Sequence, residues 1–210
     1  VTKIKIEEIA FNLNKSLFNF KSFSINKNDP IIICGRSGTG KTTLANLIAG
    51  IYNPNSGNIS YIDNNNNSYS SLTHFANIGY VTQNIYLYNG TVKENLCLGK
   101  EIGDSLIYET LKMTDSLDFV KEMGGLNAKV LESGKSLSGG QIRRLGISRE
   151  LLKNPDIYIF DEIIAGLDEI NKTEITKIIN VIRKNKIVII ISHEKINFEN
   201  YKIYEIKWKK

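Results

Sequence analysis

The stretch IIICGRSGTGKTT, residues 31–43, organises this 210-residue chain. An apolar run of strand length leads into a glycine-rich turn, and a helical pattern opens at Lys41. Residues 35–42 match G-x-x-x-x-G-K-[ST] at every fixed position. Glycines in such a loop let backbone N–H groups close on phosphate oxygens without a Cβ in the way. Because a strand precedes the loop and a helix follows it, the stretch predicts a phosphate-binding loop rather than a chance glycine-rich turn.

The side chains of this loop have the chemistry that bound phosphates require. Lys41 can place its positive charge against the outer phosphates, and the Thr42 hydroxyl can bind Mg²⁺. The helix that follows directs its positive N-terminal end at the anion.

The composition is that of an ordinary globular protein, with 41% hydrophobic and 23% charged residues. Its length suits one large domain, or a domain with a subdomain. The net charge of +5 permits anionic partners, but the basic residues form no arginine stripe with interleaved aromatics, so we expect no nucleic-acid partner. No apolar run approaches the roughly 18 residues of a membrane span, and no signal peptide is present. The chain begins with Val1 rather than Met, as a piece cut from a longer protein would.

Strand patterns with one buried face occur mainly in the first part of the chain. Residues 3–13 and 17–26 alternate in polarity and predict two strands joined by a short polar turn. Residues 58–62 and 78–81 predict two further strands. Residues 202–208 alternate again and predict a closing hairpin or an edge strand.

Two fully apolar runs, residues 157–160 and 187–191, predict buried strands of a parallel sheet. Asp161 and Glu162 follow the first run, and His193 lies just beyond the second. In open α/β sheets the ligand lies beyond the carboxyl ends of the strands. We therefore expect these three side chains to share one site with the phosphate loop.

Between these strand regions, the residues from 91 to 152 have helical patterns. Thr91 and Glu94 form a capping box, and Asp104 and Asp115 can each cap a following helix. This arrangement predicts an inserted helical subdomain.

The stretch Leu137-Ser138-Gly139-Gly140-Gln141 precedes one of these helices. Ser138 and Gln141 form a capping box, and a capped helix start with two glycines can also bind an anion. Leu-Ser-Gly-Gly-Gln is in addition the signature of ATP-binding cassette (ABC) proteins, which the chain resembles along nearly its whole length. Other matches follow in order: a Walker A loop at 35–42, a Q-loop glutamine at Gln83, a Walker B strand with its glutamate at 157–162, a D-loop at 165–168 and a switch histidine at His193.

Two segments resemble the exporter branch of this family. Residues 87–95 are similar to the segment after the exporter Q-loop, and residues 130–134 are similar to the exporter cross-contact loop, from which Leu131 and Ser133 depart.

The resemblance implies an α/β fold, a P-loop NTPase core with a mostly parallel sheet, an N-terminal antiparallel β subdomain and an inserted α-helical subdomain. The whole chain, 1–210, is then one ABC nucleotide-binding domain. Its expected parts are an antiparallel β part (about 1–30 and 57–70), an ATP-binding core (about 31–56, 78–83 and 155–210) and a helical signature subdomain (about 84–154).

In this family two cassettes pack head to tail, and each ATP lies between the Walker A loop of one and the signature of the other. The residues that the resemblance assigns to nucleotide binding are Leu13, Gly35, Arg36, Ser37, Gly38, Thr39, Gly40, Lys41, Thr42, Thr43, Gln83, Ser138, Gly139, Gly140, Gln141 and Asp168. The metal ligands for Mg²⁺, direct or through water, are Thr42, Gln83 and Asp161.

The catalytic residues implied are Lys41, Glu162 and His193. Glu162 polarises the attacking water as general base, and His193 bridges to the γ-phosphate. Asp168 couples the two sites. One position departs from the family, because Leu13 stands where an aromatic residue usually stacks on adenine; Leu13 packs on the base, or Phe11 or Phe18 substitutes.

The resemblance implies an ATPase, the motor domain of a membrane ABC exporter at the cytoplasmic face of the cell membrane. Its implied partners are a transmembrane domain, in the same or a separate chain, and a second nucleotide-binding domain in an ATP-dependent dimer. The exported substrate, a peptide, lipid or drug, is left open. The alternative is a soluble, non-transport ABC ATPase. Translation factors of that kind carry two cassettes in one chain, and DNA-associated ones split the cassette with a coiled coil, neither of which this sequence contains.

Overall fold

The computed structural model describes residues 1–13, 16–70, 77–131, 137–193 and 200–206. The chain divides into two compact units, and each is described by itself. The first unit comprises Val1–Tyr80, Asp156–Glu162 and Ile182–Lys210, and the second comprises Val81–Pro155 and Ile163–Val181. Residues 163–181, which the sequence analysis groups with the ATP-binding core, fall in the second unit.

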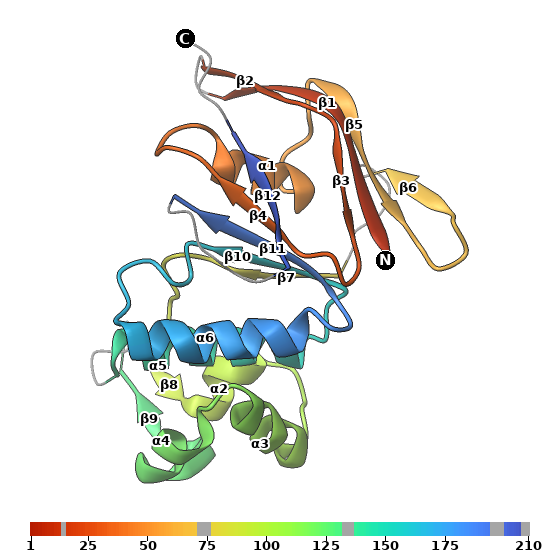
Figure 1. Ribbon diagram of the computed structural model, residues 1–210. Coiled ribbons are helices and arrows are strands. Elements are labelled where there is room, and N and C mark those ends of the chain that lie inside the picture. The colour runs from red at the N-terminus through yellow and green to blue at the C-terminus, as the bar shows by residue number, and fades with distance from the viewer. Residues whose placement is uncertain (14–15, 71–76, 132–136, 194–199, 207–210) are drawn as a thin grey trace. The chain divides into compact units, whose positions relative to one another are not determined.

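An antiparallel sheet forms one layer of the first unit (Figure 1). Its strands are β1 (Lys3–Leu13), β2 (Ser16–Phe20), β3 (Phe23–Asn26), β5 (Ser56–Ile62) and β6 (Ser68–Ser70). β2 and β3 pair with successive parts of β1, so the strand expected over 17–26 is interrupted after Phe20.

The interruption coincides with an irregularity in β1. Glu8 has a positive φ of 32°, and its N–H donates to Ser22 Oγ at 3.0 Å. Gly57 of β5 faces this point, where a Cβ would lie 2.2 Å from the carbonyl oxygen of Glu8. The bulge in β1 therefore requires a glycine on β5 and a break between β2 and β3.

A second sheet has the strand order β12-β4-β11-β10-β7. Its strands are β4 (Ile31–Cys34), β7 (Ile78–Val81), β10 (Ile157–Asp161), β11 (Ile187–Ser192) and β12 (Lys202–Glu205). β10 is parallel to β11, and β4 is parallel to both β11 and β12. Every residue of β4, β10 and β11 is buried, as expected for strands covered on both faces. Of the two alternatives for the C-terminal segment, the edge strand is correct; residues 207–210 lie outside the described part.

Helix α1 (Lys41–Ile48) lies between the two sheets of the first unit (Figure 1). Leu44 and Leu47 are fully buried in a core shared with both sheets. Burying each such side chain contributes about 1.5–3 kcal/mol. The Tyr61 hydroxyl of β5 donates to the carbonyl oxygen of Ile48, which fixes the end of α1 against the antiparallel sheet. The phosphate loop thus joins two elements, β4 and α1, that are both anchored in this core.

The second unit is mainly helical. It contains α2 (Val92–Cys97), α3 (Asp104–Met113), α4 (Leu117–Glu122), the 3-10 turn η1 (Gly125–Asn127), α5 (Gly139–Leu152), most of α6 (Glu169–Ile182), and a small ladder of β8 (Gly90–Thr91) and β9 (Lys129–Val130). A core of its own includes Leu87, Ile107, Leu111 and Leu145. Among the described residues, no helix has the length and apolarity needed to cross a membrane.

Of the four caps that the sequence predicts for α2 to α5, those at Thr91 and Ser138 are present and those at Asp104 and Asp115 are not. Thr91 and Glu94 form the capping box at α2. Asp104 is instead the first helical residue of α3, and its carboxylate binds Lys93 at 2.6 Å. Asp115 follows the end of α3 with a φ of 51°, a left-handed conformation that aspartate tolerates, and Ser116 stands at the start of α4.

Candidate active site

The phosphate loop of the first unit joins β4 to α1, and two of its glycines have no room for a side chain. A Cβ on Gly35 would lie 2.8 Å from both the Ile206 carbonyl oxygen and Thr39 Oγ1. Gly40 has a φ of 95°, and a Cβ there would lie 2.5 Å from the ring of Phe18. The pattern of glycines in the sequence is therefore a steric requirement of this loop.

Lys41 lies under the loop rather than in solvent, with 6% of its surface exposed. Its ammonium donates to the carbonyl oxygens of Gly35 at 2.9 Å and Arg36 at 3.1 Å. An ammonium has three N–H donors, so it can add a phosphate oxygen to these two bonds. Arg36, Ser37 and Gly38 are exposed at the rim of the loop.

The N-terminus of α1 is suited to an anion. Among the described residues, no side chain caps this helix and its first turn contains no acidic residue. The first N–H groups of a helix have no partner within the helix, and they carry its positive dipole end. Phosphate oxygens are the ligands that such a terminus with a glycine-rich approach prefers.

Thr42 and Asp161 meet beside the loop. The Thr42 hydroxyl donates to Asp161 Oδ2 at 3.0 Å, and the Tyr80 hydroxyl donates to the same oxygen at 3.4 Å. Burial raises the pKa of Asp161, which outweighs the two hydrogen bonds that lower it. A buried carboxylate next to a hydroxyl is a hard oxygen donor set, and it fits Mg²⁺.

Glu162 and His193 form a pair at the ends of two neighbouring parallel strands. Nδ1 of His193 lies 3.0 Å from Oε1 of Glu162. Glu162 has a φ of 50°, and its N–H donates to the Ile191 carbonyl oxygen at 3.0 Å. A left-handed glutamate is an uncommon conformation, and such strain concentrates at functional sites.

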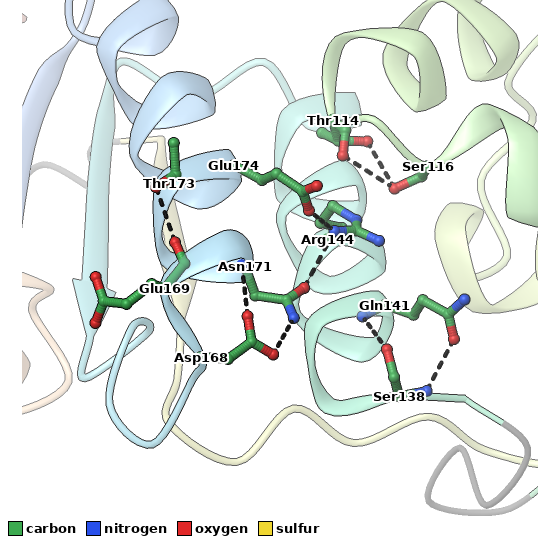
Figure 2. A network of polar contacts seen from close by, with 10 residues as sticks. All are labelled: Thr114, Ser116, Ser138, Gln141, Arg144, Asp168, Glu169, Asn171, Thr173 and Glu174. Carbon is green, nitrogen blue, oxygen red and sulfur yellow. Dashed lines mark hydrogen bonds and ion pairs between the residues drawn. The ribbon is translucent and has the colours of Figure 1, made fainter.

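In the second unit, Ser138 begins α5 with the expected capping box. Ser138 Oγ accepts from the Gln141 N–H at 3.2 Å, and Gln141 Oε1 accepts from the Ser138 N–H at 2.8 Å (Figure 2). The box uses the N–H of Gln141, while the N–H groups of Gly139 and Gly140 lie in the same first turn. A capped helix start and an anion site are therefore compatible here.

The segment before α6 is held by side chains of its own unit. Arg143 donates to the Ala165 carbonyl oxygen at 2.7 Å, and Gly166 has a φ of 69°. Asp168 caps α6, because its Oδ1 accepts from the Asn171 N–H at 2.9 Å. Gln83 follows the end of β7 and is exposed.

Comparison with known proteins identifies the family. The sequence model described as "ABC transporter" matches residues 18–165. The chain belongs to the ABC transporter family. The ABC motifs found in the sequence therefore lie on a chain with the ABC ATPase fold.

Individual relatives agree with this assignment. An uncharacterized ABC transporter ATP-binding protein of Haemophilus influenzae is 31% identical over 94% of this chain and 36% of its own length. An ATP-dependent lipid A-core flippase of Blochmanniella floridana is 35% identical over 85% of this chain and 31% of its own length. The solved structure of a bacterial Atm1-family ABC exporter with ATP bound superposes with a TM-score of 0.84 at 25% identity, over 98% of this chain and 37% of that one. The chain thus spans about a third of the length of these ABC proteins.

The ABC motifs divide between the two units. The phosphate loop, Asp161, Glu162 and His193 lie together in the first unit, and Leu13 ends β1 of that unit, partly buried against its core. The second unit contains Gln83, the signature turn and Asp168. Residues 132–136, which include most of the exporter-like cross-contact loop, lie outside the described residues.

The contacts of three residues of this ABC domain were not predicted from the sequence. Tyr80 reaches Asp161, Arg143 reaches Ala165, and Asn171 reaches Asp168. The contact of Asn171 could have been predicted, because Asn171 lies three residues after Asp168, and a side chain at that position can interact with the capping residue. Tyr80 and Arg143 bind partners distant in sequence, and no local pattern indicates them.

Proposed function

We propose that this chain is the ATP-hydrolysing motor domain of a membrane exporter, acting as a head-to-tail dimer with ATP between the two copies. The observation that carries the proposal is the Glu162–His193 pair at 3.0 Å, located at the strand ends beside Thr42 and Asp161. A site that bound nucleotide without hydrolysis would have no need of a carboxylate held at this position in a strained backbone conformation.

The phosphate loop binds the outer phosphates through its backbone N–H groups, the N-terminus of α1 and the ammonium of Lys41. Thr42 and Asp161 would hold Mg²⁺, directly or through water, and the family resemblance assigns Gln83 to the same ion. When bound, the ion neutralises charge on the transferred phosphoryl group. Because Asp161 is already buried, little solvent has to leave its carboxylate.

Glu162 accepts a proton from the attacking water as general base. His193 orients that carboxylate through Nδ1 and can direct its other ring nitrogen to the γ-phosphate. Both side chains end adjacent strands, so the sheet fixes their separation.

The signature turn of a second copy closes over the γ-phosphate. One helix N-terminus, that of α1, leaves the outer phosphate facing water, and a second, that of α5, adds N–H donors and excludes solvent. The proposal therefore predicts a hydrolysis rate that depends on pairing of two copies.

Two aromatic residues, Phe11 and Phe18, are candidates to meet the adenine of ATP. Phe11 stacks on Tyr52 with ring centroids 5.3 Å apart and is buried, so it is already engaged in the core. The Phe18 ring lies against Gly40. We therefore favour Phe18, together with Leu13, as the surface that meets adenine.

The export role rests on the relatives. They include a protein named as a lipid A-core flippase and a structure named as an exporter, and this chain covers about a third of each. A transmembrane domain, in the same or a separate chain, is the partner that a transport motor requires, at the cytoplasmic face of the membrane. The alternative, a soluble ABC ATPase, predicts no hydrophobic spans in the gene upstream of Val1 or in its neighbours, and reading that sequence separates the two.

The ATPase is tested by measuring phosphate release across a range of protein concentrations. Turnover per molecule should rise steeply with concentration. Glu162→Gln should lower it about 100-fold or more, the usual worth of a general base, and should let ATP accumulate a dimer visible by sedimentation. Glu109→Gln, the same change at an exposed position of α3, is the matched control. Equal turnover in dilute and concentrated samples, or an active Glu162→Gln protein, would contradict the proposal.

A further inference from the structure

The side chain of Asn171 touches two functional segments of the second unit at once. Its Nδ2 donates to Asp168 Oδ2 at 2.8 Å, and its Oδ1 accepts from Arg144 Nη1 at 3.3 Å (Figure 2). Both amide atoms are therefore used, one toward the segment before α6 and the other toward α5.

The same oxygen lies directly against the first turn of α5. A Cβ on Gly140 would be 1.9 Å from Asn171 Oδ1, so this contact exists because position 140 has no side chain. At Gly139, one residue earlier, a Cβ would meet nothing within 4 Å. A Cβ at position 140 would therefore displace the Asn171 amide, whereas a Cβ at position 139 would not.

Arg144, which donates to Asn171, is itself held by several contacts. It is buried, its guanidinium pairs with Glu174 of α6, and it lies 5.7 Å from the centroid of the Phe119 ring. Its neighbour Arg143 binds the Ala165 carbonyl oxygen. The N-terminal half of α5 is therefore joined to Ala165 through Arg143 and to α6 through Arg144.

We propose that Asn171 is a positioning residue that holds the Asp168 carboxylate and the signature turn together, so that one copy presents both to the other as a single preassembled surface. The inference rests on the proposed function, because it concerns the ATP-dependent dimer. The contacts of Asn171 given above are with Asp168, Arg144 and Gly140, and it acts through Asp168 and Gly140.

Such a role predicts a separation between nucleotide binding and turnover. The phosphate loop, in the first unit, binds nucleotide in a single copy, so the Kd of a dilute sample for ATP stays unchanged when Asn171 is altered. The kcat falls, since the partner surface must now be ordered during closure; misplacement at a distance from the chemistry can cost up to about 100-fold.

Two substitutions distinguish positioning from packing. Asn171→Ala removes both amide bonds. Asn171→Asp keeps the shape and the acceptor for Arg144, but it turns the donor toward Asp168 into a second carboxylate, and like charges repel. Thr173→Ala is the matched control, since Thr173 is exposed and bonds the Glu169 carbonyl oxygen of its own helix.

We expect the kcat of Asn171→Ala and Asn171→Asp to fall about tenfold or more, with the melting temperature of Asn171→Asp and the ATP affinity of both close to wild type. Thr173→Ala should match wild type in all three. Wild-type turnover in Asn171→Asp would overturn the proposal, since a packing role tolerates that change. So would equal losses of kcat and ATP affinity.

Amide hydrogen exchange tests the link between Asn171 and the signature turn without relying on ATP hydrolysis. In the full chain without nucleotide, the amides of residues 137–142 should exchange faster in Asn171→Ala than in Thr173→Ala. If wild type hydrolyses no ATP at any concentration, the proposed function fails, while faster exchange still supports the link between Asn171 and the signature turn. Equal exchange in the two variants would overturn that link whatever the ATPase result.

Discussion

The hydroxyl of Thr42 and the carboxylate of Asp161 are joined by a 3.0 Å hydrogen bond, although the two residues lie on different elements far apart in the sequence. Thr42 lies in the first turn of α1, and Asp161 ends β10. The bond holds a hydroxyl and a carboxylate oxygen together, so the magnesium site proposed above would require little rearrangement to bind the ion.

Replacing Thr42 by valine should weaken the affinity for the Mg²⁺ that supports ATP turnover. Valine keeps the shape of the side chain and removes the hydroxyl, so the Mg²⁺ concentration at half-maximal rate should rise tenfold or more, roughly the loss seen when a supporting ligand is removed. Thr42→Ser keeps the hydroxyl and should stay near wild type. Titration of turnover with Mg²⁺ measures this, and identical midpoints for valine and serine would exclude Thr42 as a ligand.

Replacing Asp161 by asparagine should stabilise the metal-free domain at neutral pH while abolishing magnesium-dependent turnover. Burial raises the pKa of Asp161 above its ordinary value of 3.8. The folded state therefore loses stability as the pH rises from 3.8 through the folded pKa, and the loss is complete above that pKa. Asparagine has no charge to bury. Thermal denaturation in EDTA at pH 7 should show a higher melting temperature for the variant, and the difference should shrink as the pH falls toward 3.8. A lower melting temperature at pH 7 would contradict the argument.

The parts of the site that follow from local pattern were predictable. The apolar runs that became β4, β10 and β11 identified the strands and the polar residues at their ends, because a buried parallel strand has few alternatives once its length and flanking residues are given. The capping boxes at Thr91 and Ser138 also formed as expected, since both partners lie within four residues of each other.

Features that depend on contacts between distant segments were not predictable. The break between β2 and β3 reflects the bulge at Glu8 of a neighbouring strand. Asp104 was expected to cap α3, but Lys93 attracts its carboxylate. The contact of Gly140 with the Asn171 amide is visible only once Asn171, on another helix, is placed.

Substitution of Gly140 tests its contact with the Asn171 amide through the free energy of unfolding. Gly140→Ala in the wild-type background forces the Asn171 amide away, and the loss of its hydrogen bonds should destabilise the domain by about 0.5–1.5 kcal/mol for each bond. With Asn171→Ala the space is open, and the better helix propensity of alanine, up to about 1 kcal/mol, should make the same change neutral or stabilising. Gly139→Ala is the control, because its Cβ meets nothing. Urea denaturation of the single and double variants gives the coupling free energy between positions 140 and 171. Additive effects on the free energy of unfolding would show that these positions do not interact.

The carboxylate of Asp168 should report the presence of the Asn171 amide through its titration. Hydrogen bonds from the backbone and then the side chain of Asn171 lower the pKa of Asp168 below its ordinary value of 3.8. A lowered pKa contributes stability that is present above 3.8 and is lost as the pH falls through the folded value. Asn171→Ala removes the side-chain bond and leaves the backbone bond, so the pKa should move up toward 3.8 without reaching it. Carboxyl chemical shifts followed by NMR against pH measure this. Since Thr173→Ala leaves both bonds in place, it should titrate as wild type, and a pKa in Asn171→Ala equal to that of wild type would mean that the amide does not hold Asp168 in solution.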